Sequence, residues 1–177
     1  MPGPDPSAYL VLSLANTARA EPDTDLLQTR EQAAAWLRAQ ALLPADAGLT
    51  GSEHAALLRL RESVRDLLAA HTDGRQDAAA AARLTRALAD GRLVLTVDPG
   101  SAVGLASAAR ASYSGVVAGV AVAIARSAAA GTWPRLKSCA AADCGQAFLD
   151  ESAAATALYC GAHAAGEAGE AGTGGPG

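Results

Sequence analysis

Three cysteines near the C-terminus, Cys139, Cys144 and Cys160, are the residues of this sequence best suited to metal chemistry. Four residues separate the first two. Gly145 follows the second and permits a tight turn in which backbone N–H groups approach the sulfur. Zinc takes four nitrogen, sulfur or oxygen ligands in a tetrahedron. The three thiols therefore predict a zinc site that needs one more ligand.

His163, three residues after Cys160, is the predicted fourth ligand of a Cys3His site. Two alternatives stay open: a different fourth donor, such as an oxygen atom or water, or no metal at all, with His163 an ordinary surface residue. Residues 135–163 are too few to bury a core of their own. A zinc ion here would therefore be structural, because it would order the segment.

The composition favours a mainly α fold that is neither basic nor membrane-bound. Half of the 177 residues are hydrophobic, many of them alanine, and only 3% are aromatic, which is typical of closely packed helices. The formal net charge is −4, whereas a dedicated nucleic-acid-binding domain is usually basic on at least one face. No apolar run approaches the roughly 20 residues of a spanning helix. We expect a soluble, cytoplasmic protein with reduced thiols.

Two capping boxes predict where the first long helices begin. Thr29-x-x-Gln32 opens a helix that continues to about Leu42, and Thr50-x-x-Glu53 opens a second one that ends at Asp73-Gly74. The second helix carries leucines and a valine at spacings of three and four, which predicts one buried stripe: Leu57, Leu60, Val64, Leu67 and Leu68.

A short β-hairpin and a buried helix are predicted to follow. A third helix runs from Asp77 to Asp90, residues 92–97 read as a strand, and residues 101–105 are its predicted partner. Residues 106–129 are predicted as a central helix that is apolar on every face. The predicted fold is mainly α, with domain boundaries at 1–132 (helical), 133–165 (zinc-ribbon-like) and 166–177 (a disordered, low-complexity tail).

Motifs at both ends resemble one known family. Residues 10–17 (LVLSLANT) are similar to its pattern L-x-L-D-x-x-N-T, with Ser13 at the aspartate, and Asp25-Leu26-Leu27 and Trp36-Leu37 match the element that follows. At the other end, the family pattern R-x-C-x4-C-x3-F-x-D-x-S resembles the stretch from Lys137 to Ser152.

These motifs are those of the CGNR zinc-finger family, whose N-terminal part is the ABATE domain. The resemblance implies a stress-responsive transcriptional regulator with a zinc module that binds DNA. The signature itself is degenerate here, because residues 165–168 read Ala-Gly-Glu-Ala in place of Cys-Gly-Asn-Arg. The chain thus lacks the family's fourth cysteine at its expected position.

Charge argues against DNA binding by the zinc module. Residues 138–177 contain no lysine or arginine and five acidic residues, whereas phosphate contacts by basic side chains supply most non-specific DNA affinity. Another face could bind DNA through arginines on the predicted helices, although a solvated helix face explains them as well: Arg59, Arg61, Arg65, Arg83 and Arg86.

The alternative to a transcriptional regulator is a helical ligand-sensing or protein-interaction module whose zinc finger has decayed. Asn16 and Thr17, polar residues after an apolar run, could then line a ligand pocket, although a cap of a turn or helix start is the favoured interpretation of Asn16. A small-molecule effector, a protein partner and a homodimer are all compatible with this hypothesis. We do not expect an enzyme, because His54 and His71 fall on different faces of one helix and no nucleophile motif occurs.

Overall fold

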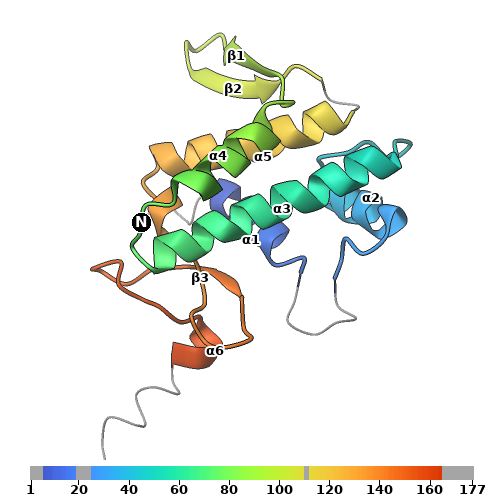
Figure 1. Cartoon of the computed structure of the whole chain (residues 1–177). Helices are drawn as coiled ribbons and strands as arrows, with labels where there is room; N and C mark the ends of the chain where they lie inside the picture. Colours follow the sequence, from blue (N-terminus) through green and yellow to red (C-terminus); the bar gives the residue numbers. More distant parts are fainter. Residues whose placement is uncertain (1–5, 19–24, 110–111, 165–177) are drawn as a thin grey trace, which may run out of the picture.

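The computed structural model describes residues 6–18, 25–109 and 112–164. As predicted, the fold is mainly α (Figure 1). The tail predicted as disordered lies outside the described residues. The helices are α1 (Pro6–Ala15), α2 (Arg30–Ala39), α3 (Gly51–Thr72), α4 (Ala78–Leu88), α5 (Tyr113–Ala129) and α6 (Gly161–Ala164); the strands are β1 (Leu93–Val97), β2 (Val103–Ser107), β3 (Leu136–Ser138) and β4 (Ala147–Leu149).

Both predicted capping boxes are present. The hydroxyl groups of Thr29 and Thr50 accept the backbone N–H groups of Gln32 and Glu53, whose side chains reach back to the cap residues. Helix α2 ends at Ala39, short of the predicted end at Leu42. The reason is that Ala41 adopts a left-handed backbone conformation, with a φ of 56°, which ends the helix.

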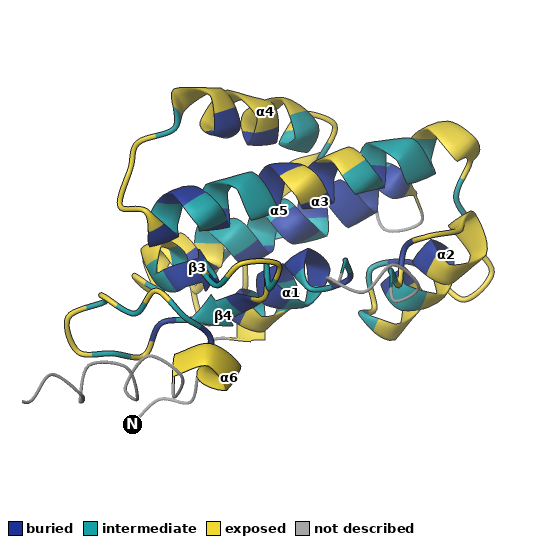
Figure 2. Ribbon diagram, turned by 60° about the horizontal axis from the view of Figure 1, so that its bottom comes forward, coloured by how far each residue is buried: buried dark blue, intermediate teal, exposed yellow. Residues whose placement is uncertain are grey.

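The core lies where α1, α3 and α5 meet (Figure 2). Four of the five residues in the predicted stripe of α3 are buried, and Leu67 is partly buried. Val116, Val117 and Val120 of α5 are buried as well, which agrees with a central position for that helix. Helix α4 packs on α3 and keeps much of its outer face exposed. No helix in the described ranges is long and apolar enough to cross a membrane.

The predicted hairpin forms, but the predicted start of the helix after it was wrong. Strands β1 and β2 are antiparallel, and Ala106 and Ser107 continue the ladder opposite Val94 and Leu93. Because these two residues belong to the strand, α5 begins only at Tyr113. The hairpin extends away from the helices (Figure 1), and three of its side chains are more than 60% exposed: Leu95, Val97 and Val103.

Candidate metal site and its junction with the helical domain

The structure brings Cys139, Cys144, Cys160 and His163 together, with all four ligand atoms within 4.8 Å of one another. The Sγ atoms of Cys144 and Cys160 are 3.9 Å apart, and Nδ1 of His163 lies 3.3 Å from the Cys160 Sγ and 3.6 Å from the Cys139 Sγ. Zinc–ligand lengths give tetrahedral edges of about 3.8 Å between two sulfurs and about 3.6 Å between sulfur and nitrogen. The donors therefore fit one zinc ion.

Two short segments deliver these ligands. Cys139 directly follows β3, and Cys144 lies in the turn that leads into β4. Asp143 and Gly145 on either side of Cys144 both have positive φ, at 61° and 56°. Cys160 directly precedes α6, and the backbone N–H of His163 donates to the Cys160 carbonyl at 2.9 Å. A single turn thus holds the last two donors on the same side.

The thiols lie in an environment that favours at least one thiolate. Burial opposes ionisation of Cys139, but backbone N–H groups of Cys160 and Ala141 lower its pKa to about 7. One of these groups, the N–H of Cys160, points at the Cys139 sulfur at 3.4 Å. Burial and the neighbouring thiols raise the pKa of Cys144 to about 11. Metal binding would therefore displace a proton from Cys144.

A buried ion pair organises the loop between β4 and Cys160. Lys137 donates to the Asp150 carboxylate at 2.7 Å, and both side chains are at most 5% exposed. Lys137 also donates to the carbonyls of Ala155 and Ala157. Asp150 in turn accepts from the backbone and hydroxyl of Ser152. The family motif from Lys137 to Ser152 therefore shapes the loop that carries the chain to its third cysteine.

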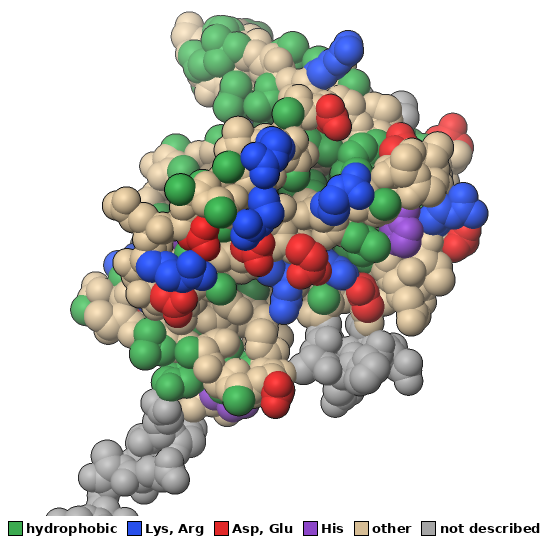
Figure 3. Space-filling view, viewed as in Figure 1, with side chains coloured by type: hydrophobic (Ala, Val, Ile, Leu, Met, Phe, Trp, Pro, Cys, Tyr) green, Lys and Arg blue, Asp and Glu red, His purple; other side chains and the backbone are tan. Residues whose placement is uncertain are grey.

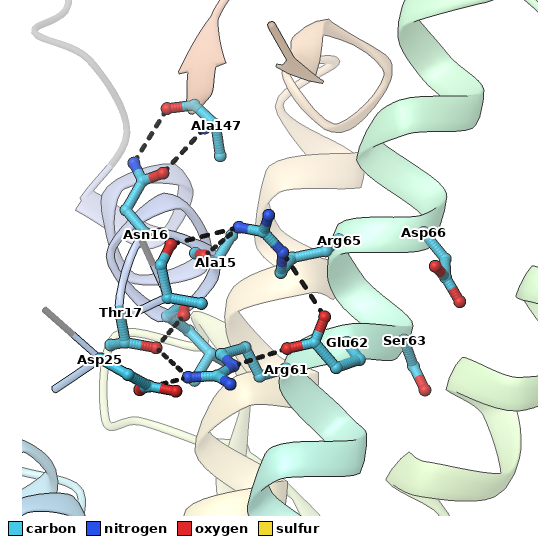
Figure 4. A network of polar contacts seen from close by, with 12 residues as sticks. Ala15, Asn16, Thr17, Asp25, Arg61, Glu62, Ser63, Arg65, Asp66 and Ala147 are labelled. Carbon is cyan, nitrogen blue, oxygen red and sulfur yellow. Dashed lines mark hydrogen bonds and ion pairs between the residues drawn. The ribbon is translucent and has the colours of Figure 1, made fainter. Parts of the chain in front are cut away.

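The hairpin of β3 and β4 is capped along both edges by side chains of the helical part. Ser138 and Ala147 are opposite each other in the register. Thr72, at the end of α3, donates to the Ser138 carbonyl at 2.7 Å and accepts its N–H at 3.0 Å. Asn16, just after α1, donates to the Ala147 carbonyl at 2.9 Å and accepts its N–H at 2.8 Å (Figure 4). Neither edge residue therefore keeps an unpaired backbone group.

Further contacts fix the hairpin against α3. The Nδ1 of His71 lies 2.9 Å from the carbonyl oxygen of Leu136 in β3, and its ring meets Trp133 edge-on. Arg65 donates to the Ala15 carbonyl at 2.9 Å. Its guanidinium covers Gly145, where an added Cβ would lie only 2.9 Å from Nη2. The metal module is thus built onto α1 and α3.

Asn16 and Thr17 have structural partners. The hydroxyl of Thr17, a fully buried residue, donates to the Leu14 carbonyl at 2.7 Å. It also lies 3.4 Å from Arg61, which forms a 2.6 Å ion pair with Asp25 (Figure 4). These contacts account for both polar residues. Ligand binding by Asn16 and Thr17 stays a prediction.

The helix arginines do not form one basic surface. Arg61 was wrongly placed among candidate DNA contacts, because its side chain is 7% exposed and paired with Asp25. Arg83 is paired with Asp66 at 2.8 Å, while Arg59 and Arg86 are exposed. Basic and acidic side chains alternate over α3 and α4 (Figure 3). This agrees with the hypothesis of a solvated helix face for the exposed members of the set.

Comparison with known families agrees with this architecture. A family model described as "Putative stress-induced transcription regulator", ABATE, matches residues 8–132. The CGNR zinc-finger model matches residues 135–168. The chain therefore belongs to the ABATE family and carries a CGNR zinc finger, as its motifs suggested. A comparison with curated proteins finds no match.

The capping of the hairpin was missed by sequence reasoning. The motif that contains Asn16 and Thr17 was recognised, but it was related to a pocket or a turn rather than to the zinc module 131 residues away. Lys137 was noted only as part of a motif. As the one lysine of the chain, two residues before a predicted metal ligand, it offered a signal for a buried pair.

Proposed function

We propose that this chain acts in transcription regulation and that its zinc module stabilises the fold and does not bind DNA. Membership of a family described as a transcription regulator supports the first part. The observation that carries the second is the charge of the module. Within the described residues 133–164, two basic side chains belong to the module. Lys137 is buried against Asp150, and the half-buried Arg135 donates to the carbonyls of Asp150 and Ser152.

The net charge of the module is negative. Asp143 and Glu151 are exposed acidic residues. One Zn²⁺ with three thiolates and a neutral histidine adds a further −1 by charge arithmetic. A module of this net charge repels phosphates and offers few basic side chains to displace the cations condensed on DNA.

DNA binding by the full chain, purified with zinc, tests the second part. Fluorescence anisotropy with a labelled mixed-sequence duplex at about 50 mM salt, where phosphate contacts are strongest, should show no binding up to micromolar protein. A matched variant, Asp143→Lys/Glu151→Lys, should gain weak, salt-sensitive binding. Tight binding by the parent chain that weakens with salt and is lost in a Cys160→Ser variant would overturn the proposal.

The regulatory part needs a cellular test. A strain that lacks the gene should show altered transcript levels under stress, and the parent gene should restore them. A gene encoding Asn16→Ala should restore them less well, because it weakens the attachment of the hairpin. Unaltered transcript levels in the deletion strain across several stresses would contradict a regulatory role.

Protein interaction is a second candidate function, favoured by the β1–β2 hairpin. Leu95 and Val97 of β1 and Val103 of β2 are 63–68% exposed. Their alternate spacing and the pairing of Val97 with Val103 place them on one face. Two copies could cover these faces in a symmetric dimer. Sedimentation should then show a dimer in the parent and a monomer in Leu95→Lys; a monomeric parent at all concentrations would contradict it.

That the chain is not an enzyme stays a prediction, and the three histidines have the following surroundings. His54 lies 2.7 Å from the carbonyl oxygen of Leu27, and His71 lies close to that of Leu136. His163 belongs to the metal cluster. Each histidine thus has a structural partner among the described residues.

A further inference from the structure

A pocket of about 550 Å³ opens between α3 and α4, with the first residue of α5 among its lining residues. Its volume falls within the range of small-molecule sites. None of the residues that line it belongs to the metal cluster or to its junction with α1. The pocket is therefore a site distinct from the metal cluster.

The most informative lining residue is Tyr113. Its side chain is buried, at 9% exposure, yet it borders the pocket. No hydrogen bond joins its phenol to another group in the described part of the chain. Burial raises the pKa of Tyr113 to about 12, so the phenol keeps its proton and can donate. The Tyr113 hydroxyl is not among the fully buried unpartnered atoms of the described residues, so it opens to the pocket, where a ligand could accept its proton.

The rest of the lining is amphipathic. Ala56, Leu58 and Ala87 contribute apolar surface, and Arg59 and Arg86 contribute two guanidinium groups. Arg59 and Asp90 line the same pocket as Tyr113; the guanidinium lowers the pKa of the phenol, the carboxylate raises it, and burial outweighs both. The pocket therefore offers a ligand both apolar surface and charged groups.

The charge balance of the pocket leaves room for one anion. Three arginines and three acidic residues line it. Arg83 is paired with Asp66, and Glu62 is paired with Arg61 and Arg65, which are not lining residues. Two guanidinium groups, on Arg59 and Arg86, and one carboxylate, on Asp90, then remain among the lining residues without an ion pair in the described part of the chain. The excess within this described set is one positive charge.

We propose that this pocket binds an amphipathic organic anion, with its acidic group between Arg59 and Arg86, its apolar body against Leu58, and a hydrogen bond from Tyr113. The acidic group would be a carboxylate or a sulfonate, which guanidinium groups bind through charge-assisted hydrogen bonds. Ligand binding goes beyond the proposed regulatory function and does not depend on it.

The test uses 1-anilinonaphthalene-8-sulfonate, a fluorescent anion of this class, titrated into the full chain purified with zinc. We expect saturable binding at one site per chain. An Arg59→Gln/Arg86→Gln variant should bind at least about tenfold more weakly, because the sulfonate loses its charge-assisted hydrogen bonds. Tyr113→Phe should weaken binding by a smaller factor without loss of the helical circular dichroism.

Three controls separate the pocket from other surfaces. Arg126→Gln removes an exposed arginine of α5 outside the pocket and should leave the affinity unchanged. Leu95→Lys tests binding on the exposed hairpin and should also leave it unchanged. N-phenyl-1-naphthylamine has the same rings without the sulfonate, and its affinity should not respond to the arginine substitutions.

Either of two results would overturn the proposal. One is equal affinity of the sulfonate for the parent and for the Arg59→Gln/Arg86→Gln variant. The other is the absence of saturable binding to the parent chain. If the double variant does not fold, the comparison of Tyr113→Phe with Arg126→Gln decides, because the first removes a single hydroxyl from the pocket and the second none.

Discussion

The side-chain amide of Asn16 pairs with both backbone polar groups of Ala147, through bonds of 2.9 and 2.8 Å. In the same way, the hydroxyl of Thr72 pairs with the carbonyl and the N–H of Ser138 in β3. Ser138 and Ala147 are opposite each other in the hairpin of β3 and β4. Side chains of the helical part therefore hydrogen-bond to this residue pair at both edges of the hairpin. The two-stranded hairpin, marginal alone, is thereby joined to the helical core.

Substitution of Asn16 by alanine should lower the free energy of unfolding by about 2 kcal/mol, because two part-buried backbone groups lose their partners. Chemical denaturation of the full chain measures the change. Asn16→Asp should fall between parent and alanine, since a carboxylate still accepts the Ala147 N–H but cannot donate to its carbonyl. Equal stability of parent and Asn16→Ala would show that the pairing contributes nothing.

Lys137→Met should destabilise the chain by about 3 kcal/mol or more, because it leaves the Asp150 carboxylate buried without its countercharge. Burial alone would raise the pKa of Asp150, but hydrogen bonds from Lys137 and Ser152 lower it to about 2. The pKa in the folded chain is thus below that in the unfolded chain. The stabilisation by this pair is present above about pH 4 and is lost as the pH falls toward 2.

A Lys137→Met/Asp150→Asn double variant controls for this effect. With the buried charge removed as well, it should lose less stability than the sum of the two single variants. Additive losses would mean that the two side chains act independently, contrary to the 2.7 Å contact between them.

His71 should make the free energy of unfolding depend on pH nearer neutrality than Asp150 does. Burial lowers its pKa below the ordinary value of 6.5, although the hydrogen bond to Leu136 partly opposes this. As the pH falls, His71 therefore takes up a proton more readily in the unfolded chain than in the folded chain. Stability is lost as the pH falls below about 6.5 toward the lower pKa of the folded chain.

The measurement is the unfolding free energy from pH 8 to pH 5 for the parent and for His71→Gln, both loaded with zinc. Because both proteins keep the same metal ligands, the effect of acid on the metal site cancels in the difference. The variant should show the flatter profile. Parallel profiles would contradict a neutral, buried His71.

The elements that follow local rules were predictable from the sequence. The capping boxes at Thr29 and Thr50 depend on residues three apart, and the apolar stripe of α3 depends on spacings of three and four. The end of α2 and the start of α5 were misplaced, because a left-handed Ala41 and the continued pairing of Ala106 and Ser107 have no clear local signal.

The candidate site also has a part that local sequence patterns predicted and a part that they did not. Cysteine spacing suggested the three thiols, and a short separation suggested His163. The partners of Asn16 and the burial of Arg61 arise from contacts between residues far apart in the sequence, which depend on how the helices pack. For the same reason, no sequence pattern marked Tyr113 and the two arginines of α3 and α4 as neighbours.

The central claim is that Cys139, Cys144, Cys160 and His163 hold one structural zinc ion. The most direct test is the zinc content of the full chain, purified without added metal and dialysed against a mild chelator, beside His163→Ala and Glu151→Gln. We predict about one zinc per chain in the parent and in Glu151→Gln, and loss of zinc from His163→Ala. Parent protein without zinc, or His163→Ala that retains it equally, would contradict the claim.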